Sequence, residues 1–148
     1  MPGNQYPIFS RVGEVSSNNG VASSARLGQV LTVAAGDYTG VNGNNQIVFT
    51  SDSTNGSYLQ KLRFKALGTN VASVARIYMN NGGTNTVANN NILIGEQTLP
   101  ATTAIATAST IDLDYPMNMA LNPGFQILVG LGTTVAAGWA VSPVGGDY

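Results

Sequence analysis

The sequence predicts an all-β domain, a β-sandwich of the jelly-roll type with about eight strands, preceded by an extended N-terminal arm. Short apolar runs recur about every ten residues and turn signals separate them, a pattern typical of sandwiches and barrels. Asn-Gly pairs, which supply the positive φ angles of tight turns, occur at four places. No window keeps a helical apolar period over several turns, so no long helix is expected. An immunoglobulin-like sandwich is the alternative, because one sequence does not give the order of the strands.

The start of the chain differs in composition from the rest. Two prolines lie in the opening segment, and few of its side chains are large and apolar. We therefore expect residues 1–26 to form an extended arm and residues 27–148 to form the sandwich domain. Tyr6, Ile8 and Phe9 are large apolar residues of this arm, and we predict that they contact a partner.

The first half of the domain contains five expected strands. Gln29–Val33 and Gln46–Ser51 are short runs with β-branched residues, and each lies next to a turn signal. Tyr58–Leu67 alternates polar and apolar residues, which predicts a strand with one buried face. Val71–Asn80 and Asn91–Leu99 flank a turn rich in glycine and asparagine.

Proline and small residues divide the next part of the chain. Ala101–Thr110 consists mostly of Ala and Thr and is expected to be a loop. Ile111–Asp114 and Met117–Leu121 are expected as two short strands on either side of Pro116, because proline has no N–H for a strand ladder.

Phe125–Gly130 and Thr134–Val141 are expected to form a terminal hairpin, since large residues alternate along both segments. Trp139, the only tryptophan, lies near the end of this hairpin. It is expected to anchor either the core or a subunit interface, and in the second case it contacts a partner. The final segment, Gly145–Tyr148, is expected to be a flexible polar tag.

The residue types that most enzymes use in their sites are scarce. Histidine and cysteine are absent, and the chain has six Lys or Arg and seven Asp or Glu in 148 residues. We therefore expect no enzymatic activity, no metal and no cofactor. A net charge of −1 offers little attraction to a polyanion, so nucleic acid is not an expected partner. No apolar run is long enough for a membrane span or a signal peptide. The absence of cysteine fits synthesis in a reducing cytoplasm.

The densest group of charges is Lys61, Arg63 and Lys65, which share one face at strand spacing. Arg76 follows on the next expected strand. One interpretation is a small basic patch made of these four residues that binds an acidic partner surface. The other is the solvated outer face of a half-buried strand.

Asp112 and Asp114 are also spaced by two, so they share a face as well. Ion pairs with the basic residues across strands would contribute roughly 0.2–1 kcal/mol each. Paired carboxylates also serve as acid and base in glycosidases, but nothing in the sequence sets the separation that this chemistry needs. Ion pairing is therefore the preferred interpretation.

Two short strings occur twice. Thr-Val-Ala-Ala-Gly occupies residues 32–36 and 134–138, and Leu-Gly-Thr-x-Val-Ala occupies residues 67–72 and 131–136. Their separations differ, so they do not define a tandem repeat. Biased composition is the expected explanation.

The segments Asp114-Tyr115-Pro116, Pro123-Gly124-Phe125 and 131–139, together with the Asn/Thr/Gly-rich strands and the arm, resemble virion proteins of tailed bacteriophages. The resemblance is to capsid decoration (cement) proteins built as β-sandwiches. It covers residues 45–148 in style and the C-terminal part of the chain in motif.

This resemblance implies a virion structural protein that binds the outer capsid surface and stabilises the shell. The implied partners are the major capsid protein and further copies of the chain, with a trimer favoured, and many weak contacts at repeated sites would add up to firm binding. A tail, baseplate or head–tail component is an alternative. A glycan-binding sandwich is another, with Tyr38, Tyr58 and Tyr78 as candidate contacts.

Overall fold

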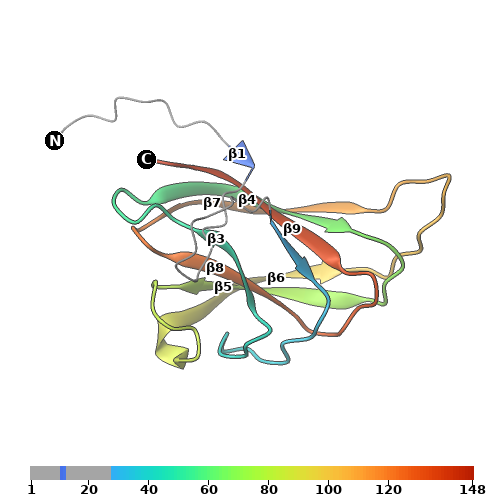
Figure 1. Ribbon diagram of the computed structural model, residues 1–148, viewed down its shortest axis with the longest axis horizontal. Coiled ribbons are helices and arrows are strands. Elements are labelled where there is room, and N and C mark those ends of the chain that lie inside the picture. The colour runs from blue at the N-terminus through green and yellow to red at the C-terminus, as the bar shows by residue number, and fades with distance from the viewer. Residues whose placement is uncertain (1–10, 13–27) are drawn as a thin grey trace, which may run out of the picture.

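The computed structural model describes residues 11–12 and 28–148 (Figure 1). Within these ranges the chain forms nine β-strands and one short 3-10 helix, η1. In chain order the elements are β1 (Arg11–Val12), β2 (Gln29–Leu31), β3 (Gln46–Thr50), β4 (Ser57–Ala66), β5 (Ser73–Asn80), η1 (Ala88–Asn90), β6 (Asn91–Leu99), β7 (Asp112–Leu121), β8 (Gln126–Leu131) and β9 (Trp139–Asp147). The bounds of β2 to β6 and of β8 lie within two residues of those predicted.

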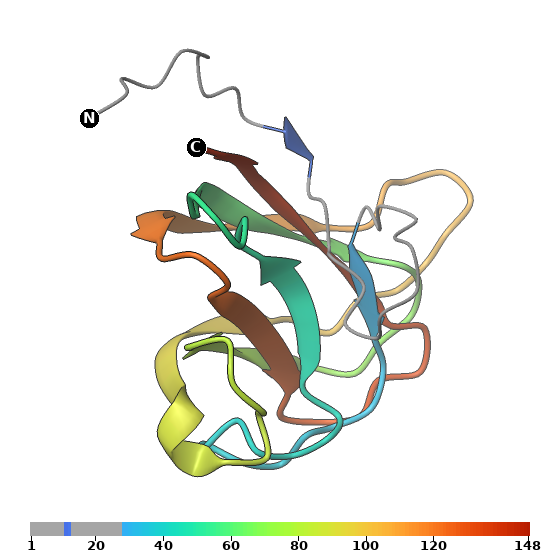
Figure 2. The same cartoon turned by 60° about the vertical axis from the view of Figure 1, so that its left-hand side comes forward.

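The strands form two antiparallel sheets that pack face to face (Figures 1 and 2). Sheet I has the order β1-β9-β4-β7, with β2 also pairing with β9, and sheet II has the order β3-β8-β5-β6. The pairs β2·β9, β3·β8, β4·β7 and β5·β6 are nested in the sequence, the first strand with the last and so on inward. This long nested hairpin, rolled up through the pairs β4·β9 and β5·β8, is the jelly-roll arrangement. The predicted all-β jelly-roll sandwich is confirmed.

The predicted break at Pro116 is wrong, because β7 runs through it as one strand from Asp112 to Leu121. β7 pairs only with β4 and is an edge strand, where a missing N–H is tolerated. The irregularity lies nearby instead: the register with β4 shifts between Leu59 and Lys61, opposite Asn118, which has a φ of 47°.

The predicted terminal hairpin is also wrong, because β8 belongs to sheet II and β9 to sheet I. Residues 132–138 carry the chain from one sheet to the other, and β9 begins at Trp139 rather than Thr134. The expected flexible tag is instead the end of β9. There the Ser57 hydroxyl donates to the Asp147 carboxylate over 2.6 Å, and the backbone N–H of Tyr148 donates to the carbonyl of Gly56.

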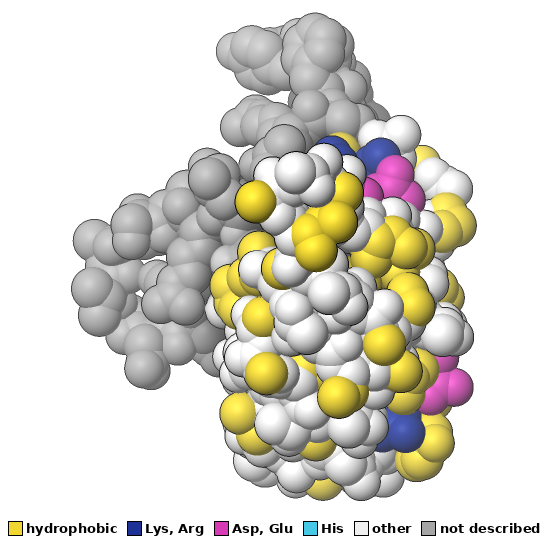
Figure 3. Space-filling view, turned by 90° about the vertical axis from the view of Figure 1, so that its right-hand side faces the viewer, with side chains coloured by type: hydrophobic (Ala, Val, Ile, Leu, Met, Phe, Trp, Pro, Cys, Tyr) yellow, Lys and Arg dark blue, Asp and Glu magenta, His cyan; other side chains and the backbone are white. Residues whose placement is uncertain are grey.

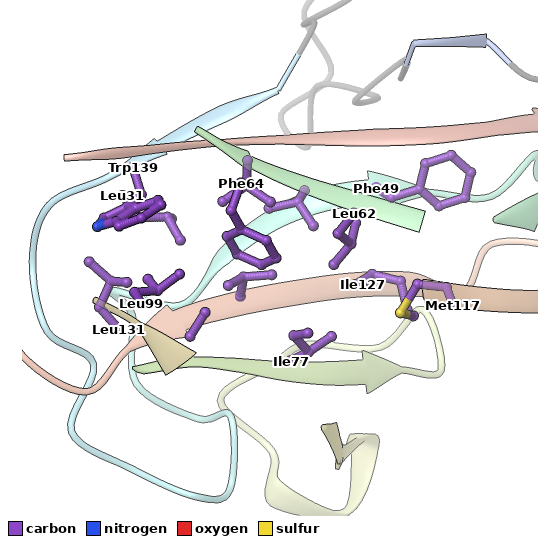
Figure 4. Close-up of a cluster of buried hydrophobic side chains, with 14 of the residues drawn as sticks. Leu31, Phe49, Leu62, Phe64, Ile77, Leu99, Met117, Ile127, Leu131 and Trp139 are labelled. Carbon is purple, nitrogen blue, oxygen red and sulfur yellow. The ribbon is translucent and has the colours of Figure 1, made fainter. Parts of the chain in front are cut away.

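One apolar core fills the space between the sheets (Figure 4). Leu62 and Phe64 of β4 and Trp139 of β9 contribute to it from sheet I, and Ile77 and Ile127 contribute from sheet II. All five side chains are fully buried. The alternating pattern of β4 predicted this burial, since residues two apart face the same side.

The two long sides of the sandwich are closed differently. On one side the edge strands β6 and β7 approach so closely that a Cβ atom at Gly95 would overlap the Tyr115 hydroxyl. On the other side β2 faces β3, and the Gln29 side-chain amide donates to the carbonyl of Ile47 over 3.2 Å. The connection between β6 and β7 therefore lies on the long side of the sandwich opposite to β2 and β3.

β1, which pairs with Val144 and Gly145 of β9, falls inside the segment predicted as an arm. The remainder of residues 1–26 lies outside the described residues, so the predicted boundary between arm and domain stays a prediction. No helix in the described ranges is long and apolar enough to cross a membrane.

Candidate functional site

The predicted basic trio lies on the outer face of sheet I, and each member is in an ion pair. Lys61 Nζ is 2.7 Å from Asp114 Oδ2, and Arg63 Nη2 is 2.9 Å from Asp112 Oδ2. Lys65 Nζ lies 3.0 Å from Asp112 Oδ1. The predicted pairing across strands is confirmed, and three cations therefore share a face with two carboxylates that offset most of their charge.

Hydrogen bonds from Lys65 and then from Arg63 hold the pKa of Asp112 below its ordinary value. The side chains of these pairs are one-third to one-half exposed. Exposed pairs of this kind contribute little to stability, because solvent screens them. The group is thus a solvated ladder of charges across β4 and β7.

Arg76 lies away from this trio, on the outer face of sheet II, so the four basic residues do not form one patch. Its Nε donates to Glu96 over 3.2 Å, and its Nη2 donates to the Tyr38 hydroxyl over 2.9 Å. The guanidinium carbon lies 4.0 Å from the centre of the Tyr38 ring, in a cation–π contact. Every cation of residues 28–148 is therefore already paired with a carboxylate.

Asp37 fixes the loop that carries Tyr38. Its carboxylate accepts hydrogen bonds from the backbone N–H groups of Gly40 and Asn42. The buried Tyr78 hydroxyl donates to the Asp37 carbonyl over 2.8 Å. Burial, followed by the nearby negative charge of Asp37, raises the pKa of Tyr78, so this phenol stays protonated and holds the loop in place.

Trp139 is fully buried in the core, and its indole N–H has no hydrogen-bond partner. Of the two alternatives for this residue, the structure shows the core anchor. Tyr6, Ile8 and Phe9 lie outside the described residues, and their predicted partner contacts stay predictions.

One end of the sandwich has a feature that the prediction of site residues missed. The connection between β2 and β3, residues 32–45, reaches this end through Thr32 and Ala34 and carries Asp37. Three further connections meet there: residues 67–72 between β4 and β5, residues 100–111 between β6 and β7, and residues 132–138 between β8 and β9. We call these three connections the loop end. None of their residues is charged. Figure 3 views this end, and charged side chains appear only near its rim.

Large apolar side chains are exposed at the loop end. Val71 is 57% exposed, Ile105 56%, Leu67 49% and Ile111 40%. Interface centres are typically depleted in charge and rich in apolar side chains. Exposed apolar patches mark interaction sites in many proteins, so the loop end is the candidate functional site.

Asn70 is the buried residue that ties the three connections together. Its side-chain Oδ1 accepts hydrogen bonds from the N–H groups of Ala137, at 2.9 Å, and Gly138, at 2.8 Å. Its Nδ2 donates to the carbonyl of Gly138, and its backbone exchanges two hydrogen bonds with Thr102. One asparagine thus fixes the second connection and the third against the first.

The connection between β6 and β7 projects beyond the ends of the strands, as Figures 1 and 2 show. We call its residues 101–110 the finger. The Thr102 hydroxyl donates to the carbonyl of Gly68 and the Thr110 hydroxyl to that of Ala66, each over 2.6 Å. A bridge between Ile105 and Ala108 closes the tip. The finger is therefore anchored at both of its ends, and Ile105 stands exposed at its tip.

The two short strings that occur twice in the sequence are the feature that could have indicated this site. Both copies of Leu-Gly-Thr-x-Val-Ala fall in or beside connections of the loop end, and the two copies of Thr-Val-Ala-Ala-Gly lie side by side. The Val135 N–H donates to the carbonyl of Thr32 over 2.8 Å, and the Ala34 N–H donates to the Thr134 hydroxyl. The sequence showed the repetition, but only the fold shows that the copies meet.

No model of a known protein family matches the sequence, and no curated protein and no solved structure is significantly similar to it.

Proposed function

We propose that this chain is a structural protein of a virion that binds the outer surface of the capsid as a decoration protein and stabilises the shell. The proposed partners are the major capsid protein and other copies of the chain, in a homo-oligomer for which a trimer is favoured. The role is one of binding, without catalysis or cofactor. The chain would be made in the host cytoplasm and end in the virion.

The observation that carries this proposal is the rigid, charge-free loop end. Removing such a surface from water costs little, because no charge loses its hydration. Because Asn70 already holds the three connections in place, little conformational entropy remains to be lost on binding. A repeated shell multiplies contacts of this kind, so a modest patch on each copy suffices.

The experiment is cosedimentation of the purified protein with phage capsids that lack it. Wild-type protein should bind the shell and raise the temperature at which the shell opens. Val71→Asp places a charge in the loop end and should weaken binding by at least about tenfold. Val87→Asp is the matched control, because Val87 is 49% exposed but lies on the connection between β5 and β6 at the other end.

Absence of the protein from purified virions, or failure of the wild type to bind any shell, would reject the proposal. Antibody labelling of tails instead of heads would move the protein to the alternative role in the tail, baseplate or head–tail junction. Equal binding by Val71→Asp and Val87→Asp would show that the shell contact lies elsewhere.

Tyr38 favours glycan binding as a second candidate function. Tyr38 is 61% exposed and its ring contacts the Arg76 guanidinium, whereas Tyr78 is buried and Tyr58 is half-buried. A fixed aromatic face beside polar groups suits the apolar face of a sugar. A glycan array should show hits that Tyr38→Ala loses and that Tyr148→Ala, a change at a second exposed tyrosine, retains.

A further inference from the structure

We propose that the finger of one copy inserts Ile105 into an apolar groove on the next copy, and that this head-to-tail contact builds the homo-oligomer. The groove lies beside β2 and the start of β3 and has a volume of about 100 Å³. Its lining residues, none of them charged, are Val30, Leu31, Thr32, Val33, Asn44 and Gln46. This inference rests on the oligomer named in the proposed function and says which surfaces form it.

The groove and the side chain match in size. An engineered cavity of about 150 Å³ accepts benzene, which has six carbon atoms. The isoleucine side chain has four, so a groove of about 100 Å³ is the right size for one such side chain. Val30 and Val33, on the lining, are each more than half exposed in the single chain and would lose that exposure to Ile105.

The two surfaces match in chemistry as well. Residues 101–110 carry no charge, and the groove is lined by three aliphatic side chains, two amides and the side chain of Thr32. Neither surface therefore has a buried charge to compensate when the two meet. The finger also has no aromatic residue and no Lys or Arg, which are the groups that membrane-surface and nucleic-acid contacts use. A second copy of the chain is the occupant that both surfaces fit.

The placement of the two surfaces makes the contact intermolecular. The finger connects β6 and β7, the edge strands on one long side of the sandwich. The groove belongs to β2 and β3, on the opposite side. The finger of one copy therefore lies away from the groove of that copy, and each copy offers a finger and a groove. Such a heterologous contact forms a closed ring when the rotation between copies closes.

The preformed finger lowers the cost of this association. Thr102 and Thr110 fix its two ends, and the Ile105–Ala108 bridge fixes its tip. Less conformational freedom is lost on binding than a loose loop of the same length would lose.

Cysteine cross-linking tests the contact directly, because the chain has no cysteine of its own. An equimolar mixture of Ile105→Cys and Val33→Cys should form covalent dimers under mild oxidation, at least about ten times more than Ile105→Cys mixed with Val87→Cys. A disulfide needs Cα atoms about 4.4–6.8 Å apart, so it reports direct contact. The double variant Ile105→Cys/Val33→Cys should give a ladder of covalent oligomers that ends at the number of copies in the ring.

Sedimentation of the free protein provides the second measurement. Ile105→Asp should raise the dissociation constant of the oligomer by at least about tenfold, and Val87→Asp should leave it unchanged. Three results would overturn the inference: wild-type protein that stays monomeric at high concentration, oligomers that Ile105→Asp leaves intact, or a disulfide within one copy of the double variant. All of these assays omit the shell, so their failure is distinct from a failure of capsid binding.

Discussion

At the scale of single residues, the Asn70 side chain makes more hydrogen bonds within the loop end than any other described side chain. It is 4% exposed, and its side-chain amide bonds backbone groups of Ala137 and Gly138 in the third connection and the Thr102 hydroxyl in the second. Asparagine suits this position because one side chain supplies both an acceptor and donors at a fixed distance. Aspartate would keep the acceptor and lose the donors that bond the carbonyl of Gly138.

Replacing Asn70 by alanine should lower the free energy of unfolding by about 3 kcal/mol, because it leaves several buried backbone groups without partners. Urea denaturation measures this change. Asn89→Ala, at an exposed asparagine of η1, is the control and should stay within about 0.5 kcal/mol of wild type. Equal stability of the two variants would contradict the role given to Asn70.

Individual residues also show where sequence reasoning works and where it stops. The alternation of β4 placed Lys61, Arg63 and Lys65 outward and Leu62 and Phe64 inward, as the structure has them. That inference is local, since strand geometry sets which residues share a face. Nothing local to Asn70 marks it as a hub, because all of its side-chain partners except the carbonyl of Gly68 lie 32 or 67–68 residues further along the chain.

At the scale of elements, the two sheets approach each other closely between β6 and β7, where Gly95 meets Tyr115. Gly95→Ala should lower the free energy of unfolding by about 1–3 kcal/mol, because its methyl group would displace the Tyr115 hydroxyl. Tyr115→Phe removes that hydroxyl, so the double variant should be more stable than the sum of the single changes predicts.

Gly43→Ala is the matched control for this cycle, because a Cβ atom at Gly43 meets no atom within 4 Å. Denaturant unfolding of the wild type, the two single variants and the double variant measures the coupling free energy between positions 95 and 115. Strict additivity between positions 95 and 115 would show that the hydroxyl and the glycine do not restrain each other.

The charged ladder between β4 and β7 has a predictable response to acid. The lowered pKa of Asp112 means that its carboxylate stabilises the fold above its unfolded pKa, and that this contribution is lost as the pH falls through the lower folded value. Asp112→Asn should therefore reduce the fall in melting temperature below about pH 4. Asp52, whose pKa is lowered by backbone hydrogen bonds from Asn55 and Thr54, remains in both proteins and gives a shared acid response.

Melting curves at several pH values measure this difference. Salt at about 1 M should shrink it, because the ladder is exposed and screened. Identical pH profiles for wild type and Asp112→Asn would show that the ladder contributes nothing to stability.

The bounds of a strand were predicted well where local turn residues set them, and poorly where pairing with a distant strand sets them. β6 has its predicted bounds because turn residues delimit it at both ends. β9 was misplaced because residues 132–141 have a strand-like composition on both sides of Gly138, while the pairing of β9 with β2 and β4 makes Trp139 its first residue. Pro116 lies inside β7 for a similar reason, since only the topology shows that β7 is an edge strand.

At the scale of the whole molecule, charge and apolar surface are separated. The cations of residues 28–148 lie in ion pairs on the outer faces of the two sheets, and the loop end has no charge. The opposite end is formed by turns rich in Asn, Ser and Gly at residues 51–56, 81–90 and 122–125. A sandwich with one apolar end and one polar end has a natural orientation on any surface that it binds.

This separation distinguishes two modes of partner binding by their response to salt. If the loop end makes the contact, affinity for the shell should change by less than about twofold between about 0.05 and 0.5 M NaCl, because no exposed charge is screened. If Lys61, Arg63 and Lys65 bind an acidic partner surface, as the basic-patch interpretation holds, affinity should fall by at least about tenfold over that range. Because Asp112 and Asp114 already offset most of the charge of these three residues, we expect the weak salt dependence. Cosedimentation with the shell across a salt series measures this dependence. A steep loss of binding with salt in the wild type that is absent in Lys61→Ala would show that the charged face of sheet I makes the contact.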